Sequence, residues 1–213
     1  SRVAKSIEEP DVVWNLNLLG TAGVLEFWRT HPCKLVYAGS STKFADPRVD
    51  GIEGRDLSPY TWAKAANTDL VANYASWYGL PYAITYFYNV YGPRELSGAY
   101  GTAVEIFHQQ YLRGEPLTVN APGTQTRHYT HVLDTVSGIV LVGEKGEGDG
   151  FGIGTEKSYA TLALAQLFEG EISMRPARKT SRPSSPVDSA KVRALGWKEE
   201  HSLEDYVASL LKK

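Results

Sequence analysis

A tyrosine and a lysine four residues apart form the pair in this sequence best suited to chemistry. Tyr60 and Lys64 lie in the stretch Ser58-Pro-Tyr-Thr-Trp-Ala-Lys64, just inside what reads as a long helix. Residues four apart share one face of a helix, one turn from each other. A phenol ordinarily titrates near pH ~10, and a neighbouring cation favours its anion. The spacing is therefore compatible with a phenol that serves as a general base, although two solvent-facing side chains would give the same pattern.

Three hydroxyl residues precede this pair by about twenty positions. Ser40, Ser41 and Thr42 follow the apolar run at 34–39, which reads as a buried strand. A hydroxyl at the end of that strand could bind a substrate oxygen beside Tyr60. The alternative is a turn in which these side chains satisfy backbone groups.

Two other classes of site have weaker support. A Ser-His-Asp hydrolase is disfavoured because no G-x-S-x-G elbow is present, and the segment 38–42 does not supply one. His128 and His131 have an odd spacing, lie near no acidic ligand cluster, and form no H-E-x-x-H motif. We therefore predict no metal site.

Arginines provide the candidate anion-binding groups. Arg94 and Arg127 each occupy a loop or a strand end near the edge of the predicted sheet, and a basic run later contains Arg175 and Arg178. A guanidinium group forks across two oxygens, which suits a diphosphate. For any single arginine, a solvated surface position is the competing interpretation.

The elements that must position these residues alternate between helix and strand. We predict helices at 10–29 and 60–78 and strands at 34–39 and 82–88. This order is typical of a parallel sheet covered by helices, with sites at the carboxyl ends of its strands. Ser40 and Asn89 each follow such an end. After Gly98 the pattern predicts the following shorter elements: helices at 103–112, 134–144, 158–168 (with Ser158 as cap), 188–195 and 202–211, and strands at 116–119, 127–132 and 151–154.

Composition sets broad limits. The chain has 213 residues, a formal net charge of −2 and a single cysteine, Cys33. The charge gives no reason to expect nucleic acid or an anionic membrane as a partner. One cysteine allows no disulfide within the chain, which suits the cytoplasm. No apolar run approaches the length of a membrane span, and the first residues do not resemble a signal peptide.

Six motifs in order resemble the extended short-chain dehydrogenase/reductases, specifically the NAD-dependent nucleotide-sugar epimerase/dehydratase family. They are Asn17-Leu-Leu-Gly-Thr21, Val36-Tyr-Ala-Gly-Ser-Ser41, Tyr60-x-x-x-Lys64, Asn89-Val-Tyr-Gly-Pro-Arg94, Gly123-Thr-Gln-Thr-Arg127-x-Tyr-x-x-Val132 and Lys191-x-x-x-Leu195-Gly-Trp197. The resemblance covers essentially the whole chain, and within the family it is most like the UDP-glucose 4-epimerases.

The resemblance implies an α/β fold and a role for each motif. The fold would be the C-terminal part of a Rossmann-like parallel sheet at 1–95, plus a smaller mixed α/β substrate domain at 96–213, with about 126–145 returning to the Rossmann domain. The catalytic residues would be Ser40, Tyr60 and Lys64. The same three residues would contact NAD together with Asn17 and Tyr88. Ser41, Thr42, Asn89, Arg127 and Arg178 would bind the nucleotide-sugar substrate.

The implied reaction is NAD-dependent 4-epimerisation of a nucleotide sugar through a 4-keto intermediate, in a homodimer built on the helices at 10–29 and 60–78. A 4,6-dehydratase or reductase is the enzymatic alternative. The family's dehydratases carry an Asp-Glu pair after the catalytic threonine, whereas Ser41-Thr-Lys43 follows Ser40 here.

Three further departures qualify the resemblance. His128 replaces the family's usual aspartate, and the R-P-G-D carboxylate has no counterpart near Arg178. No G-x-x-G-x-x-G loop follows a strand in the sequence, although that loop seats the dinucleotide pyrophosphate. We therefore expect the chain to need another segment for full cofactor binding, and a non-catalytic fragment that binds nucleotide sugars is the third hypothesis.

Overall fold

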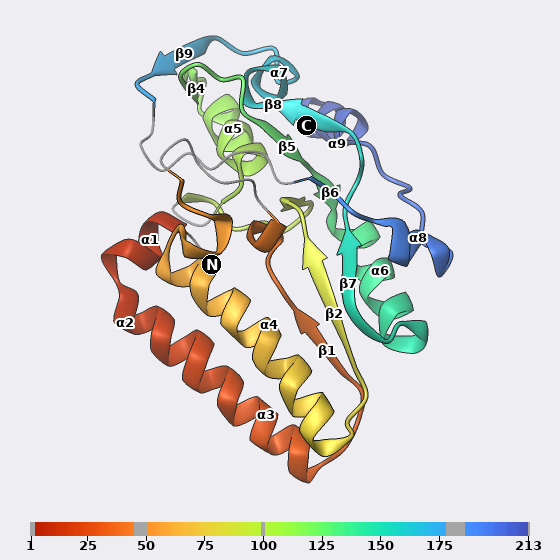
Figure 1. The fold of residues 1–213 in the computed structure, drawn as a ribbon. Helices are drawn as coiled ribbons and strands as arrows, with labels where there is room; N and C mark the ends of the chain where they lie inside the picture. Colours follow the sequence, from red (N-terminus) through yellow and green to blue (C-terminus); the bar gives the residue numbers. More distant parts are fainter. Residues whose placement is uncertain (1–2, 45–50, 99–100, 178–185, 213) are drawn as a thin grey trace.

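The computed structural model describes residues 3–44, 51–98, 101–177 and 186–212. Its centre is a three-stranded parallel sheet in the order β1 (Leu35–Ala38), β2 (Tyr82–Phe87) and β7 (Gly148–Ile153). Leu35 pairs with Tyr82, and Phe87 pairs with Ile153. The predicted α/β class with a parallel sheet is confirmed (Figure 1).

Alternating residues of β2 divide the core around the sheet into two layers. Ile84 and Tyr86 are fully buried in a cluster with the helices α3 (Gly20–Thr30) and α4 (Pro59–Tyr78). Ala83 points to the other side, into a cluster that includes Val142 of α6 (Val132–Lys145). Successive side chains of a strand face opposite sides, so one strand anchors helices on both faces. Figure 1 shows α3 and α4 on one side of the sheet and α6 on the other.

The predicted helix at 10–29 is one continuous rod with an irregular middle. It consists of α2 (Pro10–Val13), the π-helical turn η1 (Trp14–Leu19) and α3, and the short helix α1 (Val3–Glu8) precedes it. Two 3₁₀ turns, Ser41–Phe44 and Gly54–Asp56, lie between β1 and α4. A π turn inserts one residue into a helix and frequently marks a functional position.

The remaining elements form a second layer of structure above the sheet in Figure 1. Its strands are β3 (Val90–Tyr91), β4 (Leu117–Asn120), β5 (Thr126–His128), β6 (Thr130–His131), β8 (Ser158–Ala160) and β9 (Ile172–Arg175). Its helices are α5 (Ala103–Leu112), α7 (Thr161–Gln166) and α9 (Leu203–Leu211), while α8 (Ala190–Ala194) packs near β7. A separate core that includes Phe107, Leu117, Phe168 and Leu203 holds this layer together.

One predicted element is wrong at its start. Residues 158–160 form strand β8 rather than the first turn of a helix, and the helix begins at Thr161 with no side-chain cap. The antiparallel pairing of β8 with β5 joins Ser158 to His128 and overrides the local cap signal. The division at residue 95 stays a prediction; the chain returns to the main sheet as far as β7, beyond the segment 126–145.

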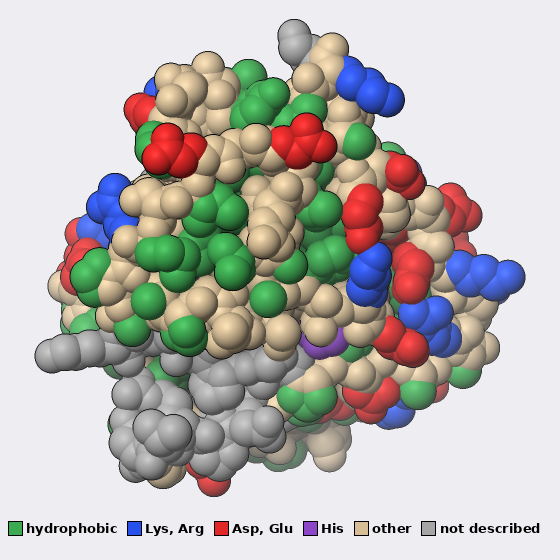
Figure 2. Space-filling view, turned by 90° about the horizontal axis from the view of Figure 1, so that it is seen from above, with side chains coloured by type: hydrophobic (Ala, Val, Ile, Leu, Met, Phe, Trp, Pro, Cys, Tyr) green, Lys and Arg blue, Asp and Glu red, His purple; other side chains and the backbone are tan. Residues whose placement is uncertain are grey.

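The surface of the upper layer mixes side-chain types. Figure 2 shows apolar side chains gathered across this face, with acidic and basic side chains interspersed around them. Leu112 of α5 and Met174 of β9 are among its exposed apolar residues. The described residues of this face therefore present no continuous basic surface. Across the described ranges, no helix is long and apolar enough to span a membrane.

Candidate active site

The start of α4 is fixed by a reciprocal cap, which places Tyr60 and Lys64 on successive turns. The Ser58 hydroxyl accepts a hydrogen bond from the Thr61 amide (3.3 Å), and the Thr61 hydroxyl accepts one from the Ser58 amide (3.0 Å). Pro59 opens the helix, where its missing N–H costs nothing. Tyr60 therefore lies in the first turn, with Lys64 one turn later on the same face.

The ammonium group of Lys64 is held against the end of β1. Its Nζ donates to the backbone oxygen of Ala38 at 2.9 Å and lies 3.5 Å from the hydroxyl oxygen of Tyr37. Nζ also lies 4.9 Å from the centre of the Tyr37 ring. Burial lowers the pKa of Lys64, because desolvation disfavours the charged form. The long helix and the neighbouring strand together fix the position of this cation.

Of the three hydroxyl residues after β1, Ser40 is the one that lines a cavity. It lies in the turn after β1, and its Oγ is 2.8 Å from the Oγ1 of Thr42, whose backbone N–H also donates to Ser40 Oγ (3.4 Å). Ser41 and Thr42 are buried, at 3% and 2% exposure, and neither lines the cavity described next. In this structure Thr42 therefore orients Ser40.

Four of the predicted site residues line one cavity of about 600 Å³. Ser40 and Tyr60 come from the β1 and α4 side, Asn89 follows β2, and Arg127 lies on β5 of the upper layer. The volume is in the range that accommodates a small-molecule ligand. The cavity lies at the carboxyl ends of the parallel strands, which is where sites form in such sheets.

Asn89 and Arg127 belong to the side of the cavity nearest the upper layer. The Asn89 side chain donates to the backbone oxygen of His128 at 3.0 Å, which joins the end of β2 to β5. Arg127 Nη1 donates to the Thr126 carbonyl oxygen at 2.6 Å, and burial lowers the pKa of Arg127. An arginine remains charged despite such a shift, so the cavity contains a partly desolvated cation.

Two other predicted residues, Asn17 and Tyr88, do not line this cavity. Asn17 is in the π turn, where its side chain donates to the Val13 carbonyl (3.3 Å) and its own carbonyl accepts from the Asn67 side chain (2.8 Å). Tyr88 is buried at 2% exposure, and burial raises the pKa of its phenol. Arg178 lies outside the described residues.

The cavity has further lining residues that the sequence alone did not single out. They are Gly39, Phe87, Val90, Gly101, Thr102, Ala103, Ile106, Phe107, Thr118, Asn120, Tyr129 and Thr161. Five of them, Gly101, Thr102, Ala103, Ile106 and Phe107, belong to α5 or to the two residues before it. Asn120 ends β4, and its position at a strand end was the only available signal. The polar members add hydroxyl and amide groups to the lining of the cavity.

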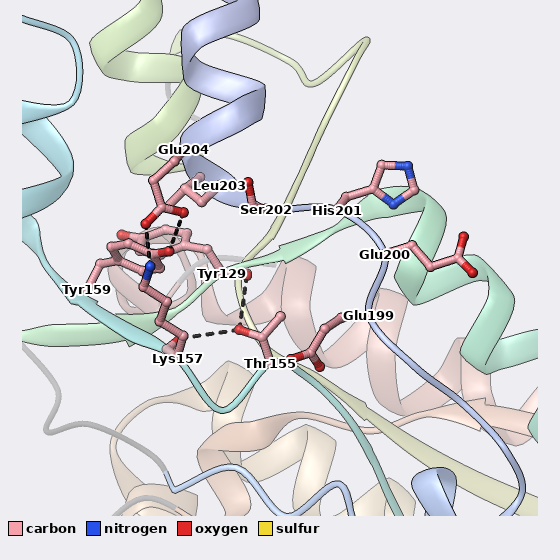
Figure 3. A pocket seen from close by; sticks show the side chains of 10 residues that line it. All are labelled: Tyr129, Thr155, Lys157, Tyr159, Glu199, Glu200, His201, Ser202, Leu203 and Glu204. Atoms are coloured by element: carbon pink, nitrogen blue, oxygen red, sulfur yellow. Dashed lines mark hydrogen bonds and ion pairs between the residues drawn. The ribbon is translucent and has the colours of Figure 1, made fainter.

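A second, smaller cavity of about 260 Å³ lies in the upper layer. Its lining includes Lys157, Tyr159 and Glu204, but no predicted site residue. Figure 3 shows these three side chains pointing toward one another. Lys157 and Glu204 form an ion pair, and the Tyr159 hydroxyl donates to Glu204 at 2.6 Å. These polar groups therefore satisfy one another.

Comparison with known proteins shows which family of proteins the chain resembles over most of its length. The model of the NAD dependent epimerase/dehydratase family matches residues 1–154. A putative UDP-glucose 4-epimerase of Methanocaldococcus jannaschii is 28% identical, with 95% of this chain and 70% of that protein aligned. UDP-glucuronic acid decarboxylase 3 of Arabidopsis thaliana is also 28% identical, over 89% of this chain and 60% of its own length.

A solved structure has the same fold. The UDP-glucose 4-epimerase of Thermotoga maritima, crystallised with UDP-glucose, superposes with a TM-score of 0.91 at 28% identity. The superposition covers all of this chain and 73% of that protein. The chain thus spans 60% to 73% of the length of these three proteins.

Proposed function

Because the chain belongs to the NAD-dependent epimerase/dehydratase family, we propose that it is the catalytic and substrate-binding part of a nucleotide-sugar 4-epimerase. The substrate would be of the UDP-glucose/UDP-galactose type. One observation carries the proposal: Ser40, Tyr60, Asn89 and Arg127 line a single cavity, and the Lys64 ammonium is fixed one helical turn from Tyr60.

Tyr60 and Ser40 would handle the proton of the sugar 4-hydroxyl. Tyr60, as phenolate, takes the proton from this hydroxyl, while the Ser40 hydroxyl bonds to the same oxygen and keeps it oriented. The positive charge of Lys64 stabilises the phenolate during this step. Tyr60 returns the proton to the oxygen once the 4-keto sugar has turned over. Only protons move between the chain and the substrate.

The Lys64 ammonium has a donor that suits the ribose at the nicotinamide end of NAD. An ammonium has three N–H groups, of which one donates to Ala38 and a second is directed at the Tyr37 hydroxyl. The third is left for a ribose hydroxyl. When bound, NAD would supply the reversible hydride transfer at C4 of the sugar. The 213 residues contain groups that suit the nicotinamide end of NAD. They contain no G-x-x-G-x-x-G loop for its pyrophosphate.

Arg127 and Asn89 would hold the diphosphate of the substrate. The guanidinium can fork across two phosphate oxygens, and its burial strengthens that interaction by excluding water. The Asn89 amide is already oriented by the His128 carbonyl. Both residues belong to the side of the cavity nearest the upper layer, so both can contact one diphosphate.

A dehydratase or reductase is the second enzymatic candidate, and the residues after Ser40 argue against the dehydratase. Dehydration requires an acid and a base at C5 and C6, whereas Ser41 and Thr42 are uncharged and buried. A non-catalytic nucleotide-sugar-binding fragment is the third candidate.

Product analysis separates these functions. Purified protein is incubated with NAD and UDP-galactose, and the anomeric protons are followed by NMR. We expect UDP-glucose to appear, and Tyr60→Phe to reduce its rate by at least about a hundredfold. Tyr78→Phe, at the exposed end of the same helix, is the matched control. A 4-keto-6-deoxy product would overturn epimerisation.

Binding measurements address the non-catalytic alternative. NAD released on denaturation is quantified, and UDP-galactose binding is measured by calorimetry with and without Arg127→Ala. UDP-galactose binding that depends on Arg127, without bound NAD or activity in added NAD, would support the fragment hypothesis. Stoichiometric NAD would exclude it.

We further propose that the chain forms a homodimer through its two long helices. Leu16, Leu19 and Phe27 on one helix, and Trp77 on α4, are more than 60% exposed. Such a stripe of large apolar side chains is typical of an interface between subunits. Analytical ultracentrifugation should show a dimer, and Leu16→Lys should give a monomer. A monomer at micromolar concentration in the unmodified protein would refute the proposal.

A further inference from the structure

The environment of Lys64 includes an aromatic residue with no assigned role. Tyr37 is the third residue of β1, and Lys64 Nζ lies 4.9 Å from the centre of its ring and 3.5 Å from its hydroxyl oxygen. A lysine ammonium within about 6 Å of a ring centre is attracted by the negative face of the π system. Tyr37 thus contacts the proposed catalytic cation with both its ring and its polar end.

Lys64 has no acidic partner in the described part of the chain. Its ammonium contacts the Ala38 carbonyl and Tyr37, and among the described residues it forms no ion pair with a carboxylate. A carboxylate would neutralise the ammonium, whereas a carbonyl dipole and a π face hold it with its charge intact. The positive charge of Lys64 is then available to stabilise the phenolate of Tyr60, one helical turn away.

Tyr37 itself stays neutral. Burial is the main cause that raises the pKa of its phenol, and the neighbouring phenol of Tyr60 raises it further, against the hydrogen bonds of Asn67 and Thr21. A neutral Tyr37 cannot compensate the charge of Lys64. Asn67 in turn donates to the Asn17 carbonyl in the π turn (2.8 Å) and to the Thr21 hydroxyl (3.1 Å). Tyr37 is therefore partly buried against the two long helices.

We propose that Tyr37 is a positioning residue: its ring holds the Lys64 ammonium beside Tyr60 without neutralising it. The geometric part concerns this chain alone. The catalytic consequence rests on the proposed epimerase function, so the test needs one readout that requires no activity.

That readout is the titration of the Lys64 side chain, followed by NMR in protein with ¹³C- and ¹⁵N-labelled lysine. Lys64→Arg identifies the signal. We expect Tyr37→Phe, which keeps the ring, to leave the titration midpoint within a few tenths of a pH unit. Tyr37→Leu should lower the midpoint by about one unit, a tenfold rise in the acid dissociation constant.

Two controls separate the ring from general damage to the sheet. Tyr82→Leu removes a partly buried tyrosine of the adjacent strand and should leave the Lys64 midpoint unchanged. If Tyr37→Leu does not fold, a trifluorinated phenylalanine at position 37 keeps the ring's shape but removes its negative face, and it should lower the midpoint relative to Tyr37→Phe. A midpoint that is equal with leucine, phenylalanine and the fluorinated ring would overturn the proposal.

Kinetics then test the consequence for catalysis. If the protein epimerises UDP-galactose, Tyr37→Leu should reduce kcat about tenfold while KM changes less than twofold. An unchanged kcat would refute the positioning role in catalysis. If the unmodified protein is inactive, the proposed function fails, while the NMR titration still decides whether the ring holds Lys64.

Discussion

Asp134 is expected to attach the C-terminal segment to the centre of the fold. This carboxylate is 2% exposed and accepts three hydrogen bonds from one short stretch of chain. The donors are the backbone N–H of Glu200 (3.2 Å), the backbone N–H of His201 (3.1 Å) and the His201 ring Nδ1 (2.8 Å). Because α9 follows directly at Leu203, Asp134 determines where that helix packs.

The loss of stability expected from replacing Asp134 can be estimated from these three hydrogen bonds. A hydrogen bond to a charged group contributes about 1.5–3 kcal/mol, and an unpaired buried donor costs a similar amount. Asp134→Asn replaces one acceptor oxygen with an N–H₂ that faces a donor, so we expect the free energy of unfolding to fall by about 2–3 kcal/mol. Asp134→Ala removes all three acceptor contacts and should cost about 3–5 kcal/mol. For a chain of this size, the asparagine variant should melt roughly 5–10 °C lower.

Asp205→Asn is the matched control. Asp205 occupies the same position in the first turn of α9 as Asp134 does in α6, but it is exposed. Its interaction with the helix dipole is worth about 0.3–1 kcal/mol. Urea denaturation followed by circular dichroism measures both variants, and an unchanged slope shows that the shift in midpoint reports stability. If the two variants differ by less than about 1 kcal/mol, the attachment by Asp134 is refuted.

Three further outcomes are expected. Ser58→Ala removes the cap of α4 and should cost about 1 kcal/mol in urea denaturation; no change would contradict the capping argument. Desolvation, with His201 nearby, lowers the pKa of His131, so below about pH 6.5 the unfolded chain binds more protons than the folded chain, and stability should fall as the pH drops from there through the lowered pKa. His131→Asn should flatten that dependence. In Gly154→Ala the new Cβ would lie 2.6 Å from Cδ2 of Tyr88, which should cost about 1–3 kcal/mol, whereas Gly23→Ala, with open space around it, should be neutral or stabilising.

The sequence predicted those features that depend on neighbouring residues. The shared position of Tyr60 and Lys64 was predicted from their spacing, because residues four apart lie on one face of a helix. The ends of the first two strands were predicted to within one residue, at 39 and 88 against Ala38 and Phe87, because apolar runs stop at polar turns. Ser40 and Asn89 therefore come to line the same cavity, as the pattern of a parallel sheet requires.

Contacts between distant parts of the chain could not be predicted from the sequence. Tyr37 reaches Lys64 across 27 positions, and Asp134 reaches His201 across 67. No local spacing encodes these contacts, because they depend on how β1 and α6 pack against other elements. The π turn containing Asn17 could not be predicted either, because the helical pattern of residues runs through it without interruption.

The two ends of the cavity are held by different parts of the fold, and this suggests how variants will separate. Tyr60 and Lys64 are fixed by α4 and β1, whereas Arg127 lies on β5, which is joined to the main sheet through the bond from Asn89 to the His128 carbonyl. Loosening that bond moves the guanidinium relative to the phenol without disturbing the phenol's own surroundings. Asn89→Ala should therefore weaken UDP-galactose binding more than it changes the Lys64 titration, and Tyr37→Leu should do the reverse. If both variants changed both properties equally, the two ends would behave as one rigid unit.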